Sequence, residues 1–329
     1  MSIECVSVPV STVWTTKASP RSIDYLITRE PYQLKSYLEK MTYDDRLQLC
    51  TNDLAQTQLL FNEPVYVVQE VNGWKEVIIP DQPTIKNENG YPGWVPSQHL
   101  VAGIPNEQTK DRVIIVQQKA WLFTKEKKAW LQVSYGTELT VLDESIDWIK
   151  VETPLGNALI KREDVRLSFN KKDGHSLLTE ARRFLGLPYL WAGMSGFGFD
   201  CSGFVYRLHK VSGITIPRDA SNQYRSGDTI VEQDMKEGDL LYFAYEEGKG
   251  RVHHVAMYAG DGNIIHAPKT GKVVEEVPLN SVYEKELCGV RRFFKFFVMG
   301  DEVNMMKEDV MVEVKDLKKH FQLKKEQNA

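Results

Sequence analysis

Hydrophobic residues at helical spacing predict helices in two parts of the chain. Near the N-terminus, PYQLKSYLEKM and YDDRLQLCTNDLAQTQLL have helix-compatible patterns, and Thr42 directly precedes the second as a candidate N-cap. We therefore predict that the chain begins with a helical arm. A later helix is predicted from HSLLTEARRFL, whose apolar residues recur at helical spacing until Gly186 ends the pattern.

Short apolar runs separated by Gly, Pro and Asn predict β-structure between these helices, and they contain a weak internal repeat. Residues 65–79 align without a gap with residues 139–153, which places Trp74 on Trp148. Downstream of each, GWVPSQHL and ALIKREDV match as a strand that leaves through a polar turn. The repeat favours two small tandem β-domains, and one larger, irregular β-domain is the alternative.

Further strand-like runs follow residue 200, namely DLLYFAY, HHVAMYAG, GNIIHAP and VRRFFKFFV. With the helical stretches before them, they predict an α+β unit that has an antiparallel sheet and helices to one side. The predicted division of the chain is a helical arm (1–60), a first β-domain (61–105), a second β-domain (106–170), an α+β domain (171–299) and a poorly ordered tail (300–329).

Composition is that of a folded protein with several domains, because 42% of the 329 residues are hydrophobic and this length suits two to four domains. A net charge of −4 gives no overall attraction to nucleic acid, and no basic cluster with interleaved aromatic residues stands out. We therefore expect no nucleic-acid partner. The four cysteines are scattered without a CxxC pair, so neither a zinc ribbon nor a disulfide framework is predicted.

The N-terminus lacks a basic segment followed by an apolar run of about 7 to 15 residues, so it does not look like a secretory signal. Nothing elsewhere reaches the roughly 18 apolar residues of a membrane span. These features predict a cytoplasmic protein with no membrane partner. A secreted chain whose signal had been removed would look the same, and oligomeric state is not predicted.

One cysteine, Cys201, lies in a setting that suits a catalytic thiol. Turn-forming residues precede it and the helix-compatible stretch SGFVYRLHKVSG follows, which predicts a place in the first helical turn. Backbone N–H groups there favour a thiolate and could hold an oxyanion. His254 lies in a predicted strand, and a DGN turn brings His266 onto the adjacent antiparallel strand. Together they predict a thiol hydrolase whose base is oriented by a third residue.

The adjacent histidines His253 and His254 are predicted to point to opposite faces of their strand, so that only one can face Cys201. We assign His254, because His253 shares its predicted face with Val255 and Met257, which look core-facing. Zinc bound by Cys201 and the histidines is the alternative, and the same alternation disfavours it. No metal or other cofactor is therefore predicted.

In this order, LGLPYLWAG, DCSGFV and HHVAMYAGDGNIIHAP resemble motifs of the NlpC/P60 family, cysteine peptidases with a papain-like core that cleave cell-wall peptides. The resemblance spans roughly residues 178–297. It implies Cys201 as the nucleophile, His254 as general base and acid, His266 as the residue that orients His254, and Tyr189 beside the nucleophile. The preceding repeat resembles bacterial SH3-like (SH3b) domains, which are small β-barrels.

The resemblance also implies where a substrate binds. Family members hold a D-glutamyl group with the residues that flank the nucleophile, here Asp200 and Ser202. Asp200 is equally a candidate helix N-cap. In the segment IPRDASNQY, Asp219 is a candidate for binding a free α-amine and Arg218 for binding a carboxylate.

In relatives that carry SH3b domains, the first of these domains can close one end of the substrate groove. If it does so here, Tyr91 in NGYPGWVP is the first candidate to line the site, and Glu63 is the second. The alternative role for Tyr91 is to pack the core of its β-barrel.

The resemblance implies the function of the γ-D-glutamyl-L-diamino acid endopeptidases of the YkfC type. They cleave the bond from D-glutamate to meso-diaminopimelate or L-lysine in murein-derived peptides with a free N-terminal L-Ala, and so recycle wall peptides. One alternative is a secreted hydrolase that remodels intact peptidoglycan and uses SH3b domains as anchors. The other is a non-catalytic wall-binding module, which would not need the cysteine and histidine set.

Overall fold

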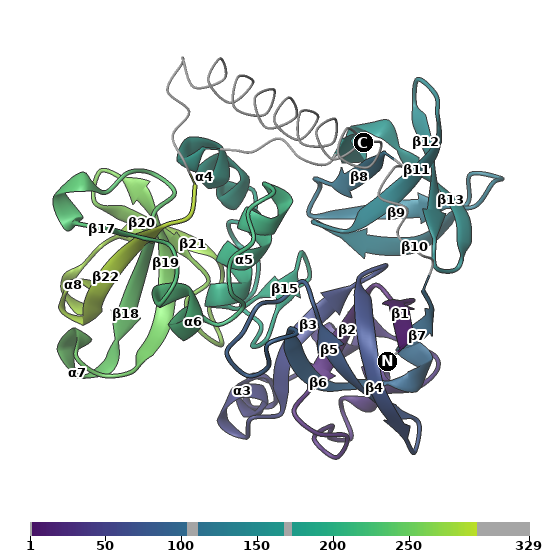
Figure 1. The fold of residues 1–329 in the computed structure, drawn as a ribbon, viewed down its shortest axis with the longest axis horizontal. Coiled ribbons are helices and arrows are strands. Elements are labelled where there is room, and N and C mark those ends of the chain that lie inside the picture. The colour runs from purple at the N-terminus through teal and green to yellow at the C-terminus, as the bar shows by residue number, and fades with distance from the viewer. Residues whose placement is uncertain (1, 104–110, 168–172, 295–329) are drawn as a thin grey trace, which may run out of the picture. The chain divides into compact units, whose positions relative to one another are not determined.

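The structure, a computed structural model, describes residues 2–103, 111–167 and 173–294 (Figure 1). Residues up to Phe293 form one contact unit. Within the described residues lie two seven-stranded sheets, one six-stranded sheet and a two-stranded ribbon. The predicted tail, 300–329, and the end of the VRRFFKFFV run lie outside the described residues.

The first sheet is antiparallel and belongs to the first β-domain. Its strands are β1 (Ser2–Val6), β2 (Val10–Trp14), β3 (Ala55–Leu60), β4 (Pro64–Val71), β5 (Trp74–Ile79), β6 (Tyr91–Pro96) and β7 (Leu100–Ala102), with the 3-10 turn η1 (Ser97–His99) before β7. They are arranged in the order β3-β2-β6-β5-β4-β1-β7.

This domain starts at the N-terminus, so the expectation of a helical arm over residues 1–60 was wrong. Strand β1 pairs with β4 and β7, and β2 pairs with β3. The helices instead form an insertion between β2 and β3: α1 (Tyr25–Thr28), α2 (Leu34–Lys40) and α3 (Tyr43–Thr51). Thr42 caps α3 as predicted, in a capping box with Asp45. Beyond α3 the expected helix gives way to β3, because pairing with β2 overrides a weak local helix preference.

The second β-domain repeats the first strand for strand. Its elements are β8 (Arg112–Ile115), β9 (Lys119–Phe123), β10 (Ala129–Ser134), β11 (Glu138–Glu144), β12 (Trp148–Thr153), β13 (Gly156–Lys161), η2 (Arg162–Asp164) and β14 (Val165–Leu167). The order β10-β9-β13-β12-β11-β8-β14 matches that of the first sheet position by position. Trp74 and Trp148 each start the equivalent strand, so the repeat found in the sequence is a structural repeat.

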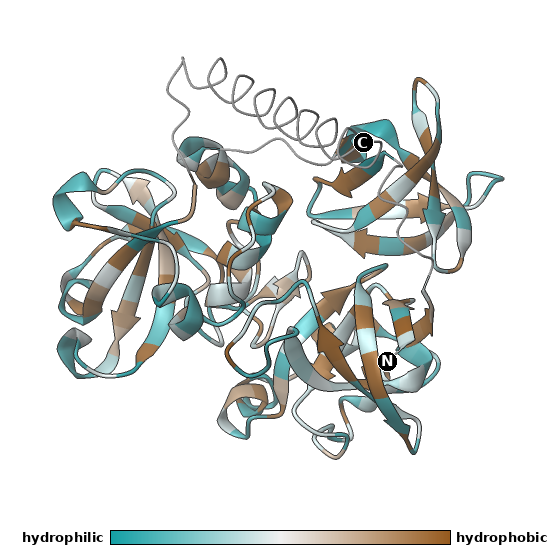
Figure 2. Ribbon diagram, in the orientation of Figure 1, coloured by the Kyte–Doolittle hydropathy of each residue, from teal (hydrophilic) through white to brown (hydrophobic). Residues whose placement is uncertain are grey.

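Each β-domain buries its own apolar cluster, and the strands carry hydrophobic and hydrophilic residues in turn (Figure 2). Tyr91 belongs to the first of these clusters. A separate cluster joins the inserted helices to the segment after α4, since Tyr37 and Leu49 pack with Trp14 and Leu190. Trp74 borders this cluster instead of filling the core of its barrel.

The third domain has an α+β fold, as predicted. Its elements are α4 (Gly174–Arg182), β15 (Met194–Ser195), β16 (Gly198–Phe199), α5 (Cys201–Val211), α6 (Ala220–Tyr224), β17 (Asp228–Ile230), η3 (Glu232–Asp234), β18 (Leu240–Ala244), α7 (Tyr245–Gly248), β19 (Val252–Gly260), β20 (Asn263–His266), β21 (Glu275–Pro278), α8 (Ser281–Glu286) and β22 (Leu287–Arg292). The antiparallel sheet has the order β17-β22-β18-β19-β20-β21, and α5 and α6 both pack against β19.

Strand β3 of the first β-domain runs along the α+β domain. The indole Nε1 of Trp191 donates to the carbonyl of Ala55 at 2.9 Å, and the backbone N–H of Met194 donates to Oε1 of Gln58 at 3.0 Å. These bonds fix the segment that leads into α5 against the barrel.

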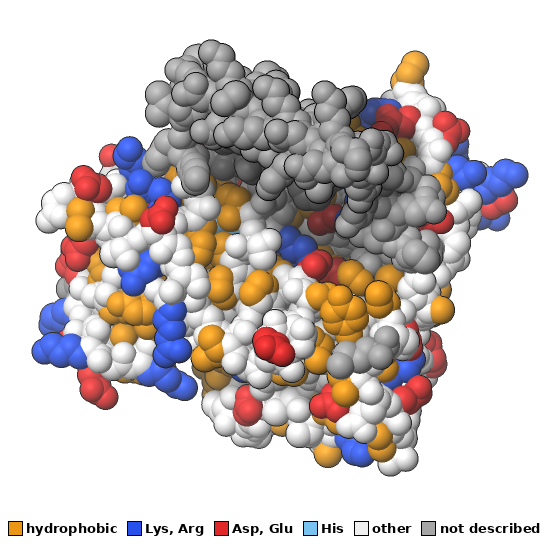
Figure 3. Space-filling view, viewed as in Figure 1, with side chains coloured by type: hydrophobic (Ala, Val, Ile, Leu, Met, Phe, Trp, Pro, Cys, Tyr) orange, Lys and Arg blue, Asp and Glu red, His pale blue; other side chains and the backbone are white. Residues whose placement is uncertain are grey.

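Acidic and basic side chains are interspersed over the described part of the face in Figure 3. None of the helices in the described ranges combines the length and apolar character that crossing a membrane requires.

A buried ion pair ties the first β-domain to α5. Glu63, in the turn between β3 and β4, accepts from Arg207 at 2.7 Å and from Lys210 at 3.2 Å. Burial alone would raise the pKa of Glu63, but the two cations outweigh it and lower that pKa to about 2. Because the folded pKa is below the ordinary value of 4.5, this stabilisation is complete above pH 4.5 and is lost as the pH falls toward 2.

We therefore predict that Glu63→Gln destabilises the protein by about 3 kcal/mol, because it leaves the buried Arg207 without a carboxylate partner and Lys210 with Asp81 alone. Thermal unfolding at pH 7 should show a clear drop in Tm, and the deficit should shrink as the pH is lowered below 4. The matched control is Glu144→Gln, which breaks the exposed pair with Arg162 and should leave Tm nearly unchanged. Equal effects of the two substitutions would contradict the assignment.

Candidate active site

Cys201 is the first residue of α5, as predicted. Asp200 is the N-cap, and its carboxylate accepts from the backbone N–H of Gly203 at 2.6 Å. Position 203 must be glycine, because a Cβ there would lie 2.1 Å from the carbonyl oxygen of Gly193. The helix start is thus packed against the preceding loop, which fixes the backbone that carries the thiol.

The charge state of Cys201 differs from the expected thiolate. Burial, and next the Asp200 carboxylate, raise the pKa of Cys201 to about 12, and the backbone N–H groups of Val255 and Ser202 offset this only in part. The helix N-terminus that the sequence predicts is present, but burial outweighs it. At neutral pH, burial and Asp200 therefore favour the neutral thiol over the thiolate.

His254 and His266 lie together on neighbouring strands, as predicted. Nε2 of His254 is 2.8 Å from Nδ1 of His266, and both rings are buried. Glu275, directly opposite His266 in the β20–β21 register, places Oε1 3.5 Å from Nε2 of His266. Glu275 was not predicted from the sequence, because only the register of β21 brings it to His266.

This chain of contacts favours one arrangement of protons. A carboxylate beside Nε2 of His266 favours a proton on that nitrogen, which leaves Nδ1 to accept from Nε2 of His254. Nδ1 of His254 is then the unprotonated, basic nitrogen. Burial lowers the pKa of His254 well below its usual range, and the neighbouring histidines lower it further, so the resting imidazole is neutral.

The expectation that His253 faces away from the site was wrong. The β18–β19 register shifts between Phe243 and Ala244, so β19 bulges at His253 and the strict alternation of faces is lost. His253 lines the same groove as His254, stacks on Tyr245 with ring centroids 4.1 Å apart, and pairs with Glu286 at 3.2 Å.

One groove of about 410 Å³ contains both Cys201 and His254. Tyr189 also lines it, in agreement with a position beside the nucleophile. The lining of the groove also includes Tyr43, Leu47 and Cys50 from α3, which form part of its wall. The sequence contained no indication of this wall, since the helices were assigned to a separate arm. Across the residues that the structure describes, no group of three His, Cys, Asp or Glu side chains is arranged to hold a metal ion.

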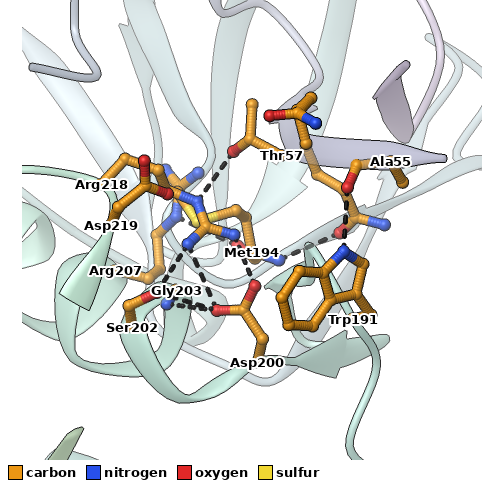
Figure 4. Close-up of polar contacts among 12 residues, drawn as sticks. Ala55, Thr57, Trp191, Met194, Asp200, Ser202, Gly203, Arg207, Arg218 and Asp219 are labelled. Carbon is orange, nitrogen blue, oxygen red and sulfur yellow. Dashed lines mark hydrogen bonds and ion pairs between the residues drawn. The ribbon is translucent and has the colours of Figure 1, made fainter. Parts of the chain in front are cut away.

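Beside the nucleophile, Arg218 joins several of the predicted substrate residues (Figure 4). Its guanidinium is buried and donates to Asp200 at 2.7 Å and to Oγ of Ser202 at 2.9 Å. Its Nε donates to Thr57 of β3 at 2.8 Å. Asp200 therefore has the N-cap role that was its alternative, together with an ion pair, and the carboxylate that Arg218 binds in this structure is that of Asp200.

Asp219, next along the chain, meets Tyr91 from the first β-domain. The Tyr91 hydroxyl donates to the Asp219 carboxylate at 3.1 Å and receives a hydrogen bond from Lys86 at 2.5 Å. Tyr91 thus packs the barrel core with its ring and reaches the α+β domain with its hydroxyl. Glu63 is not part of this cluster, because it is paired with Arg207 and Lys210.

Comparison with known proteins agrees with this geometry. The NlpC/P60 family profile matches residues 186–292, and the profile described as the YKFC SH3b2 domain matches residues 115–167. A γ-D-glutamyl-L-lysine dipeptidyl-peptidase of Bacillus subtilis is 44% identical over 87% of this chain and 97% of its own length. The chain belongs to the NlpC/P60 family.

Two further relatives extend this result to the whole architecture of this NlpC/P60 protein. A Bacillus cereus enzyme, also named γ-D-glutamyl-L-lysine dipeptidyl-peptidase, is 39% identical over 88% of this chain and 90% of its own length. The crystal structure of an NlpC/P60 family protein from the same species superposes with a TM-score of 0.86 at 38% identity and covers 89% of this chain and all of that one. The SH3b domains and the peptidase domain are therefore shared with these relatives.

The neutral resting thiol predicts a characteristic alkylation profile for this NlpC/P60 site. The rate at which iodoacetamide modifies Cys201, followed by peptide mass mapping, should keep rising from pH 6 to pH 10, because a pKa raised to about 12 leaves the thiolate fraction small at neutral pH. The other cysteine peptides of the same digest calibrate the reagent. A rate that reaches a plateau below pH 7 would instead indicate a preformed thiolate–imidazolium pair.

Proposed function

We propose that this protein is a cysteine endopeptidase that cleaves the bond between D-glutamate, through its γ-carboxyl group, and a diamino acid in cell-wall peptides. The observation that carries the proposal is a continuous arrangement around the start of α5. Cys201 and His254 line one groove, and Arg218 connects the start of α5 to Asp219 and Tyr91. The names of the two Bacillus relatives support this bond as the substrate.

In the proposed mechanism, Sγ of Cys201 attacks the γ-carbonyl carbon of the glutamyl residue while Nδ1 of His254 takes the thiol proton. Backbone N–H groups at the start of α5 stabilise the oxyanion. His254 then gives the proton to the departing amine of the diamino acid, which leaves a thioester on Cys201. Water, deprotonated by His254, hydrolyses the thioester and restores the thiol. His266 orients His254 throughout, and Tyr189 borders the nucleophile.

We assign the N-terminal side of the substrate to the residues that flank Cys201. Ser202 and Asp200, held by Arg218, border the position of the D-glutamyl group. Asp219 and Tyr91 bind the free α-amine of the preceding L-Ala, because a carboxylate and a phenolic oxygen in a partly buried site suit an ammonium group. A substrate with a free amine would be a short, released wall peptide, so we further propose a role in recycling such peptides in the cytoplasm.

The test is mass spectrometry of the products from four substrates. L-Ala-γ-D-Glu-meso-diaminopimelate, its L-lysine counterpart, the N-acetylated peptide and intact sacculi are each incubated with the protein and with the Cys201→Ser variant. The proposal expects release of L-Ala-D-Glu from the free peptides by the wild type, and a loss of at least about a thousandfold in the variant. Cleavage of sacculi would favour a remodelling hydrolase. If none of the four substrates were cleaved, a non-catalytic binding module would be favoured.

A second prediction concerns the amine site. Tyr91→Phe removes the hydroxyl beside Asp219 while keeping the ring in the barrel core, so KM for the free peptide should rise by about tenfold with kcat within about threefold of wild type. Steady-state kinetics on the tripeptide measure both constants. Trp74→Phe, a substitution elsewhere in the same barrel, is the control. An unchanged KM would remove Tyr91 from the amine site.

A further inference from the structure

The cluster around Tyr91 and Asp219 already contains an ammonium group, that of Lys86. Its Nζ donates to Oη of Tyr91 at 2.5 Å and to Oε1 of Gln56 at 2.6 Å, and lies 3.8 Å from the Asp219 carboxylate. A protonated amine has three N–H donors. In this cluster it faces three acceptors, two neutral and one anionic.

The acceptors are held in place by their other bonds. The Nε2 group of Gln56 donates to Thr15 at 2.7 Å and to Asp53 at 2.8 Å, so its carbonyl oxygen is the end that faces Lys86. The Tyr91 hydroxyl donates its hydrogen bond to Asp219, so a lone pair of its oxygen faces Lys86. Both orientations persist without Lys86, because none of these bonds involves it.

Lys86 is carried by a loop that distinguishes the first β-domain from the second. Residues 80–90 connect β5 to β6, whereas the equivalent strands β12 and β13 are joined by residues 154–155. The start of the loop is anchored on the α+β domain: Tyr206 donates to the carbonyl of Asp81 at 2.5 Å, and the Arg218 N–H donates to that of Pro83 at 3.0 Å. The loop thereby places Lys86 beside Tyr91. The shorter connection in the second β-domain has no residue at the equivalent of position 86.

Burial in the cluster disfavours the charged form of Lys86, and the side chain can move from the cluster into solvent. Burial lowers the pKa of Lys86, and the opposing effect of Asp219 does not fully restore it. The side chain remains 40% exposed, so rotation about its flexible stem returns the charge to water. A second ammonium could not share the cluster, because two like charges would compete for the same three acceptors.

We propose that Lys86 occupies the amine subsite of the unbound protein and that the α-amine of the substrate must displace it. The proposal rests on the function proposed above and adds a residue that sets its specificity. A free, protonated α-amine has the same three N–H donors as the Lys86 ammonium and can replace it at the same acceptors. An N-acylated peptide offers a single neutral N–H, leaves Lys86 in place and gains nothing from the cluster.

A binding experiment tests this without requiring turnover. Isothermal titration calorimetry measures the affinity of full-length Cys201→Ala, with and without Lys86→Met, for L-alanyl-D-glutamate and for its N-acetyl derivative. Methionine keeps the length and apolar stem of the lysine but has no ammonium. We expect Lys86→Met to tighten binding of the free dipeptide by about tenfold, because no internal ammonium has to be displaced. Affinity for the N-acetyl derivative should not change.

Lys75→Met is the matched control. Lys75 also pairs with a carboxylate, that of Glu4 at 2.6 Å, and lies on β5 of the same domain outside the cluster. It should leave both affinities unchanged. Binding of the free dipeptide that is unchanged or weaker in Lys86→Met would overturn the proposal, since Lys86 would then be neutral or part of the amine site. Equal tightening for both ligands would overturn it as well.

The kinetic assay separates this proposal from the function on which it rests. If the wild type cleaves the tripeptide but Lys86→Met leaves its KM unchanged, the role of Lys86 is wrong and the proposed activity stands. If the wild type cleaves no γ-D-glutamyl peptide, the proposed activity is wrong, and the calorimetric comparison still decides whether Lys86 competes with an amine. A tenfold fall in KM for the free peptide alone supports both.

Discussion

The site depends on one buried guanidinium, that of Arg218. It pairs with the Asp200 carboxylate that caps α5, donates to Ser202 beside the nucleophile, and donates to Thr57 of β3 in the first β-domain (Figure 4). A buried cation with a missing partner costs several kcal/mol, so each of these contacts stabilises the arrangement that the others need. The position of the thiol is therefore linked to the docking of the barrel. The next residue, Asp219, extends the link to Tyr91 of the first β-domain.

The two β-domains have the same strand order, and their differences supply the functional parts. The first carries two insertions that the second lacks: the helices between β2 and β3, and the loop between β5 and β6. Residues of α3 form a wall of the groove, and the loop carries Lys86 to Tyr91. A barrel that needs only its alternating core to fold can accept such insertions at its turns, which is why one copy is part of the active site.

The sequence predicted the features that depend on residues close together in the chain or on a repeated pattern. Helix α3 and its Thr42 cap, the repeat of β4–β5, and the grouping of Cys201 with His254 and His266 all follow from spacing and periodicity. It missed what depends on pairing across the chain. Strand β1 pairs with β4 and β7, which lie far from it along the chain. Glu275 reaches His266 through the register of β20 and β21, and the bulge that turns His253 into the groove is a register shift between β18 and β19. Glu63 was predicted to contact the substrate, because the sequence gives no sign that Arg207 and Lys210 pair with it in the fold.

The resting charge state follows from a conflict at the start of α5. Asp200 fixes the helix by capping it, yet the same carboxylate raises the pKa of the thiol that it positions. The Arg218 guanidinium lowers that pKa, but by less than burial and Asp200 together raise it. In the proposed mechanism, both Cys201 and His254 are neutral before attack, and the thiol proton moves as the carbon–sulfur bond forms. Charge then appears on an oxyanion beside backbone N–H groups, so the helix N-terminus contributes more to the transition state than to the resting thiol.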